Sequence, residues 1–157
     1  MSVSNESPVA VRGAGLAIAR LARQLEHGLE SVDLSLAQYR ILGLLREGST
    51  ASSSLADHLT VSPPSITAVV DGLVARGLVA RSADTDDRRR IHLDLTDAGL
   101  RTLDDAETQV NERLRAIAEF FEGADPDAAV STLREWHTSL DGYRQARREA
   151  KTKAAAR

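Results

Sequence analysis

The feature that most constrains the fold is a change in the spacing of apolar residues at Gly77. Before it, apolar residues recur at intervals of three and four, the spacing of one face of an α-helix. After it, residues 78–82 and 91–95 read as two short strands joined by a charged loop, residues 83–90. Because helical spacing resumes after Thr96, the sequence predicts a mainly α fold that carries one small β-hairpin.

Capping residues predict where the helices begin. Ser35 and Thr96 are each suited to an N-cap, because a hydroxyl can accept a hydrogen bond from the first turn. Ser62 precedes Pro63 and Pro64, and proline suits a first helical turn because its missing N–H would have no partner there. The expected order is a helix from residue 11, helices after Ser35 and from residue 52, the helix after Ser62, the hairpin, and two helices separated by a break at residues 123–126.

Composition excludes several classes of protein. The 157 residues fit one domain, or one domain with a dimerisation arm, and 42% of them are apolar, which is enough to build a core. No cysteine is present, so disulfides, thiolate metal sites and thiol-based redox switches are excluded. No apolar stretch approaches the roughly 20 residues that cross a bilayer, so we expect a cytoplasmic protein with no membrane partner.

Charge is distributed unevenly, although the net charge is only -3. Residues 76–92 carry 5 basic and 3 acidic groups, and residues 93–143 carry 4 basic and 12 acidic groups. Residues 144–157 carry 6 basic groups and 1 acidic group. Two locally basic segments therefore flank an acidic one, and the local charge matters more than the total for contact with nucleic acid.

The patterns of metal sites, cofactor loops and catalytic groups do not occur. No two of the four histidines have the i, i+4 spacing of metal ligands, so we expect no metal. Gly13 and Gly15 lack the preceding strand and the third glycine of a dinucleotide loop. The adjacent aspartates at 86–87 and 104–105 point in different directions, which suits acid–base catalysis poorly. We therefore expect no cofactor and no enzymatic activity.

Four stretches form a compound pattern between residues 34 and 99. They are residues 34–45 (LSLAQYRILGLL), 54–67 (SLADHLTVSPPSIT), 70–79 (VDGLVARGLV) and 84–99 (DTDDRRRIHLDLTDAG). The last is the most diagnostic, because Asp-Arg-Arg in the hairpin loop precedes an alternating strand and Leu-Thr-x-Ala-Gly. Together they resemble the winged helix-turn-helix of the MarR (multiple antibiotic resistance regulator) family of bacterial transcription factors. The resemblance implies a DNA-binding transcriptional regulator, a ligand-responsive repressor that binds a pseudo-palindromic operator as a homodimer.

The resemblance assigns two elements to double-stranded DNA. The second helix of a helix-turn-helix places its N-terminal end in the major groove, and arginines at a hairpin tip suit the narrow minor groove. Relatives frequently carry basic residues at the positions of Ala68 and Gly72, so here phosphate attraction depends on the hairpin, or wing, together with Arg76 and Arg81. The implied contacts are Ser62, Pro63, Pro64, Ser65, Thr67, Ala68 and Arg76 in the recognition helix, and Arg88, Arg89 and Arg90 in the wing, with Asp87 orienting the arginines.

The same resemblance implies how the chain is organised. A flexible start (1–10) precedes a dimerisation helix (11–31), the winged helix-turn-helix DNA-binding lobe (34–99), the C-terminal dimerisation helices (97–150) and a basic tail (151–157). The dimer interface is expected at Val11, Ile18, Leu21, Leu133, Trp136 and Leu140. A small aromatic or anionic effector is expected near Arg20, Arg23, His27, Tyr39, Arg40 and Trp136.

Three alternatives stay open on sequence alone. Tyr39 and Trp136 lie on apolar stripes, where core or interface residues are commoner than ligand contacts. Residues 144–157 read either as a fraying helix end or as an arm that contacts DNA. Finally, the uncharged recognition helix and the acidic total are also compatible with a winged-helix protein-interaction module that has lost sequence-specific DNA binding.

Overall fold

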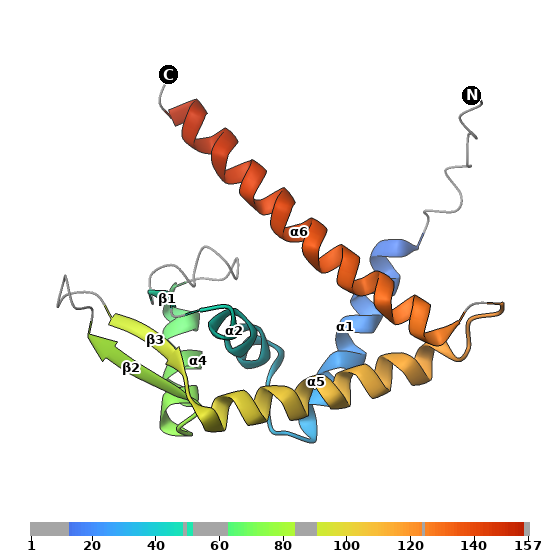
Figure 1. The fold of residues 1–157 in the computed structure, drawn as a ribbon, viewed down its shortest axis with the longest axis horizontal. Coiled ribbons are helices and arrows are strands. Elements are labelled where there is room, and N and C mark those ends of the chain that lie inside the picture. Colours follow the sequence, from blue (N-terminus) through green and yellow to red (C-terminus); the bar gives the residue numbers. More distant parts are fainter. Residues whose placement is uncertain (1–12, 49, 52–62, 84–90, 124, 156–157) are drawn as a thin grey trace. The chain divides into compact units, whose positions relative to one another are not determined.

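The computed structural model describes residues 13–48, 50–51, 63–83, 91–123 and 125–155 (Figure 1). The chain divides into two compact units, Met1–Val110 and Asn111–Arg157. This boundary falls inside one long helix, whereas the sequence pattern places the start of the C-terminal helical region at residue 97. No helix within the described ranges is long and apolar enough to cross a membrane.

Helices and a small sheet alternate in the first unit. The helices are α1 (Ala14–Glu30), α2 (Leu36–Arg46), α4 (Pro63–Ala75) and the first part of α5 (Asp97–Ala118), and the strands are β1 (Thr50–Ala51), β2 (Val79–Ala83) and β3 (Ile91–Leu95). The mainly α fold with a hairpin is therefore confirmed, and β3 has the predicted bounds. The helix expected at residues 52–59 lies outside the described residues.

The sheet has three strands rather than the two that the sequence predicted. Its order is β1-β3-β2 and both pairs are antiparallel, with Thr50 opposite Leu93 and Val79 opposite Leu95. Strand β1 contains only two residues, so it has no alternation by which a sequence pattern could reveal it. Its pairing adds an edge to the hairpin and ties the hairpin to the segment that follows α2.

Caps place the helix ends close to their predicted positions. The Ser35 hydroxyl accepts a hydrogen bond from the Gln38 amide at 3.2 Å, and the Gln38 side chain accepts one from the Ser35 amide at 2.9 Å, which completes a capping box. At the start of α5, the Thr96 hydroxyl accepts from the Gly99 amide at 3.0 Å. Gly77, in the left-handed region at φ 69°, follows the end of α4.

The core of the first unit consists of aliphatic side chains contributed by every helix and by the hairpin. Ile66, Val70 and Leu73 form the buried face of α4, which packs against α2 and β2. The other fully covered side chains include Leu29, Ile41, Leu42, Leu45, Val79, Leu93, Leu103 and Ala106. This packing fixes the orientation of α4 relative to the hairpin, and therefore which of its residues face solvent.

The second unit contains the end of α5 and the long helix α6 (Pro126–Ala155). Arg115 on α5 donates to the carboxylate of Asp127, in the first turn of α6, at 2.8 Å. Helix α6 has 30 residues and continues well into the basic tail that the sequence pattern separated at residue 151. Several of its large apolar side chains are exposed, namely Leu133, Trp136, Leu140 and Tyr143.

Candidate nucleic-acid interface

One face of α4 is open to solvent and can meet a partner. Thr67, Ala68 and Asp71 are exposed on this helix, while Ile66, Val70 and Leu73 are buried in the core. The prediction that Thr67 and Asp71 lie off the apolar stripe is therefore confirmed. This solvent-facing side presents the hydroxyl of Thr67, the methyl group of Ala68 and the carboxylate of Asp71. Contacts from Thr67 and Ala68 to bases or phosphates would therefore come from short, uncharged side chains.

An ion pair joins this face to the hairpin. Arg81, on strand β2, donates through Nη2 to the Asp71 carboxylate on α4. The two side chains are about half exposed, so the pair lies at the surface where the helix and the wing meet. The pair neutralises the only carboxylate among the exposed described positions 67, 68 and 71.

Arg76 is held against the protein rather than directed away from it. Its Nη1 donates to the Asp33 carbonyl oxygen at 2.5 Å, and its Nη2 lies 3.6 Å from the Asp33 carboxylate. Asp33 adopts φ 53° in the turn between α1 and α2, so Arg76 fastens that turn to the C-terminal end of α4. A structural role thus competes with the DNA contact that the sequence pattern assigned to Arg76.

The base of the wing is tightly bonded. Ala83 pairs with Ile91 at the open end of the described hairpin, and the Ser82 hydroxyl donates to Asp94 Oδ2 at 2.7 Å. At the other end, the Thr96 hydroxyl lies 2.8 Å from the Gly77 carbonyl oxygen, to which it donates. The hairpin strands, drawn beside α4 in Figure 1, therefore form a short, well-connected support for the loop between them.

Most of the strongest predicted DNA contacts cannot be placed. Ser62 and the wing residues Asp87, Arg88, Arg89 and Arg90 lie outside the described residues. Pro63, Pro64 and Ser65 belong to the first turn of α4, but only their backbone is described. The prediction for these residues stands on the sequence pattern alone.

A second ionic cluster links α2 to α5 within the first unit. Arg46 donates from both terminal nitrogens to the Glu107 carboxylate, at 2.9 and 2.5 Å, and lies 3.8 Å from Asp104. Hydrogen bonding to Glu107 raises the pKa of Arg46. Burial raises the pKa of the Tyr39 hydroxyl, the Glu107 charge raises it further and Arg46 lowers it, so Tyr39 stays a neutral hydroxyl beside this pair.

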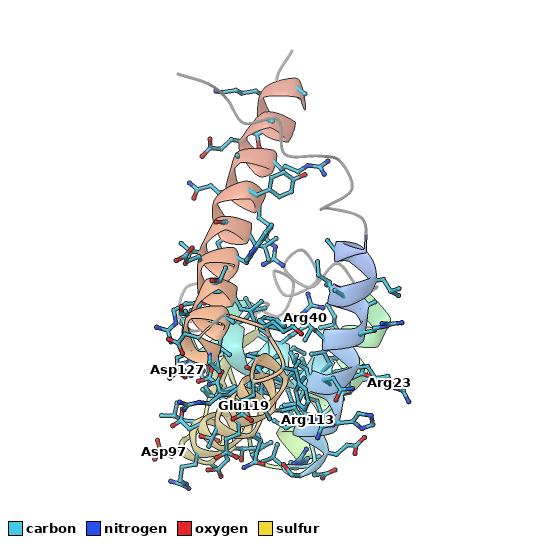
Figure 2. The ribbon with its side chains drawn as sticks, turned by 90° about the vertical axis from the view of Figure 1, so that its right-hand side faces the viewer. Arg23, Arg40, Asp97, Arg113, Glu119 and Asp127 are labelled. Atoms are coloured by element: carbon cyan, nitrogen blue, oxygen red, sulfur yellow. The ribbon has the colours of Figure 1, made fainter. Side chains whose placement is uncertain are left out.

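The candidate effector residues are mostly at the surface. Arg20 and Arg23 are exposed on α1, and Figure 2 shows Arg23 projecting outward from that helix, with Arg40 on the neighbouring α2. His27 Nδ1 lies 3.1 Å from Glu30 Oε1, at the end of α1. Tyr39 is half-buried, and Trp136 belongs to the second unit. No metal-binding group of three acidic or histidine side chains occurs among the residues that the structure describes.

Four of the six candidate dimer residues are large apolar side chains that are exposed in the single chain. Ile18 on α1 is 67% exposed and Trp136 on α6 is 65% exposed, and large exposed apolar side chains often mark an interaction surface. Leu133 and Leu140 are also exposed, and Leu21 is half-buried. Val11 lies outside the described residues.

Sequence reasoning missed the ion pairs that position these elements. Asp71 and Arg81 lie ten residues apart, and Arg46 and Glu107 lie 61 apart, so neither pair has a periodic signature. The available signal was indirect: Asp71 is the one charged residue of α4, so any ionic partner would have to come from a neighbouring element.

An exposed helix face beside a β-hairpin, on a helical core, is the arrangement of a winged-helix protein. Comparison with known proteins agrees, because the model of the MarR family matches residues 34–91. The transcriptional regulator FarR of Neisseria gonorrhoeae is 34% identical over 100 residues, which cover 63% of this chain and 68% of FarR. The chain belongs to the MarR family, and it is a DNA-binding transcriptional regulator.

Solved structures support the same fold. Wild-type MarR from Escherichia coli, in its apo form, superposes with a TM-score of 0.68 over 87% of this chain and 98% of that one, at 21% identity. NadR in complex with 4-hydroxyphenylacetate superposes with a TM-score of 0.63 over 89% of this chain and 96% of that one, at 26% identity. The structural match therefore covers nearly the full length of both of these chains.

Proposed function

We propose that the protein is a ligand-responsive repressor that binds a pseudo-palindromic operator as a homodimer. The observation that carries the proposal is the exposed, polar side of α4, joined by the Asp71–Arg81 pair to the hairpin whose loop contains three consecutive arginines. The helix would read the major groove while the wing follows the adjacent minor groove. A dimer would then place two such units on half-sites about one helical turn apart.

Repression would follow if the bound dimer occupied the promoter. A dimer of this size would cover roughly two turns of a promoter and exclude polymerase without additional machinery. NadR, at 26% identity, is held in a complex with 4-hydroxyphenylacetate, a phenolic carboxylate. That supports a small aromatic or anionic effector here, with Arg20, Arg23 and Arg40 as candidate partners for its charge and Tyr39 for its ring.

The experiment is DNA binding measured across salt concentrations, with the chain's own upstream DNA and a scrambled competitor. Arg89→Ala is expected to weaken binding to every sequence and to lower the salt slope by about 1, because one phosphate or minor-groove contact is lost. The matched control is Arg101→Ala, an exposed arginine on α5. An unchanged affinity and slope for Arg89→Ala would reject the role of the wing.

One observation favours a second candidate function. Arg76 and Arg81, the described cations nearest the recognition surface, are each paired with a carboxylate. A winged-helix module that binds another protein would need no free cation there. Salt-sensitive retention of the wild type on a DNA column, lost when Arg88, Arg89 and Arg90 are replaced, would favour the regulator over this module.

A further inference from the structure

The last turns of α6, together with the two residues that follow the helix in the sequence, form a basic segment, which we define as residues 144–157. It carries 6 basic groups and 1 acidic group, whereas residues 1–143 carry 14 basic and 22 acidic groups. Helix α6 continues to Ala155, so nearly all of this segment is helical rather than frayed. At about 1.5 Å per residue, the segment extends the helix by about 18 Å beyond Tyr143.

The apolar stripe of α6 stops where the basic segment starts. Leu133, Trp136, Leu140 and Tyr143 recur at intervals of three and four, and beyond Tyr143 the only apolar residues are alanines. Arg147 and Lys153 are exposed. A helix end with no large apolar side chain has little to bury against a protein surface, so its charges are its main means of binding.

The acidic residues within and next to this segment are fewer than its basic residues. The Arg144 guanidinium lies 3.4 Å from Asp141, and the one acid of the segment, Glu149, accepts a hydrogen bond from the amide of Gln145 at 3.3 Å. Glu149 is the one acidic residue among residues 144–157, which contain six basic residues. With 6 basic groups and 1 acidic group, the segment has an excess of five positive charges that can attract a polyanion.

Helix α4 and the described residues next to it offer few unpaired cations to attract DNA phosphates. On the described part of α4 the exposed positions carry no cation, and Arg76 and Arg81 are paired with Asp33 and Asp71. Sequence-independent affinity depends on the number of phosphates that cations neutralise. Outside the wing, the basic segment is the largest local excess of positive charge in the sequence.

We propose that the basic segment of α6 binds the phosphate backbone of duplex DNA without reading its sequence. This inference rests on the proposed function, because it adds phosphate contacts to a protein whose other elements read the operator. A membrane surface is a poorer partner, because an interfacial helix needs large apolar residues on one side and this segment has only alanines.

The acidic region of a second copy is also a poorer partner. Several of its carboxylates are already paired within their own chain, as Glu107 is with Arg46 and Asp127 is with Arg115. Those pairs lower the negative charge that remains for an intermolecular contact, whereas a DNA duplex presents a continuous row of phosphates.

The test uses the full-length protein, the double variant Arg147→Gln/Lys153→Gln, and a chain ended after Tyr143. Binding to the upstream DNA and to a scrambled duplex of equal length is measured across salt concentrations. For both duplexes we expect the double variant to lower the salt slope by about 1 for each cation that contacts a phosphate, and the shortened chain to lower it further. The ratio of operator to scrambled affinity should not change, because the segment reads no sequence.

Arg134→Gln is the matched control, since Arg134 is exposed on the same helix outside the basic segment; its slope should equal that of the wild type. An unchanged slope for the shortened chain would overturn the proposal. If the slope is unchanged but the shortened chain dimerises more weakly, the segment binds a second copy of the chain instead of DNA. If the slope is unchanged but binding to phosphatidylserine vesicles is lost, the segment binds a membrane surface instead. If no chain distinguishes operator from scrambled DNA, the proposed function fails, and the slope on scrambled DNA still decides this inference.

Discussion

At the scale of single residues, Gly99 has the least room for change. A Cβ atom added there would lie 2.0 Å from the Leu78 carbonyl oxygen and 2.8 Å from Leu95 Cδ1. The first of these neighbours is backbone, and the Leu78 oxygen also accepts from the Thr96 amide at 3.2 Å, so it cannot move without breaking the joint between the hairpin and α5. Close packing thus explains the glycine of the Leu-Thr-x-Ala-Gly motif. We expect Gly99→Ala to lower the free energy of unfolding by about 3 kcal/mol, or to prevent folding.

Two other glycines serve as controls for this prediction. Gly142 in α6 has no atom within 4 Å of an added Cβ, and Gly72 in α4 has only the Gln38 side chain, at 3.7 Å. Alanine at either position should stabilise the protein by about 0.5–1 kcal/mol, because glycine is a poor helix former. Urea unfolding at one protein concentration measures all three variants. If Gly99→Ala unfolds at the urea concentration of the wild type, the close contact is not a constraint in solution.

At the scale of elements, the ion pair that joins α4 to the wing has little expected effect on stability. A half-exposed pair such as Asp71–Arg81 contributes roughly 0–1 kcal/mol to folding. Its larger effect should be on DNA affinity, because loss of Arg81 would leave an unneutralised carboxylate facing phosphates. We expect Arg81→Gln to weaken DNA binding about tenfold, which corresponds to about 1.4 kcal/mol, with the urea midpoint nearly unchanged.

The double variant Asp71→Asn/Arg81→Gln separates this electrostatic effect from a direct contact by Arg81. Because the double variant removes the carboxylate as well as its partner, it should bind DNA more tightly than Arg81→Gln alone. Arg101→Gln, on the exposed side of α5, is the control for the loss of one positive charge. Equal affinities for the single and double variants would mean that Arg81 itself touches DNA and that Asp71 is only its partner.

Elements with a regular period were predictable from the sequence, and elements that depend on tertiary contacts were not. Strand β3 alternates over five residues and was predicted with its observed bounds, whereas the two residues of β1 form a strand only because β3 is beside them. The contact between Arg76 and Asp33 was not predicted for the same reason, and Arg76 was assigned to DNA alone. Its partner, Asp33, lies 43 residues away in a left-handed turn, and no local pattern reveals that contact.

At the scale of the whole molecule, the exposed apolar side of α6 requires a partner. Leu133, Trp136, Leu140 and Tyr143 lie on one side of the helix and are all more than 40% exposed. With about 100° between successive residues, they fall within a sector of about 80°, which is the seam of a helix that packs against another helix. A second copy of the chain would cover this side, and would also supply the second reading unit that a pseudo-palindromic site requires.

We therefore expect Leu140→Asp to shift the protein from dimer to monomer, because each interface would bury two unpaired carboxylates. Sedimentation equilibrium measures the shift, and Thr138→Asp is the control, since helical spacing puts residue 138 on the opposite side of α6. The monomer should bind one half-site and lose the gain in affinity that comes from linking two half-sites, so operator binding should fall by at least about 100-fold. If the Leu140→Asp protein remains dimeric, the dimer interface does not lie on this side of α6. If it is monomeric yet binds the operator as tightly as the wild type, the operator does not require two paired half-sites.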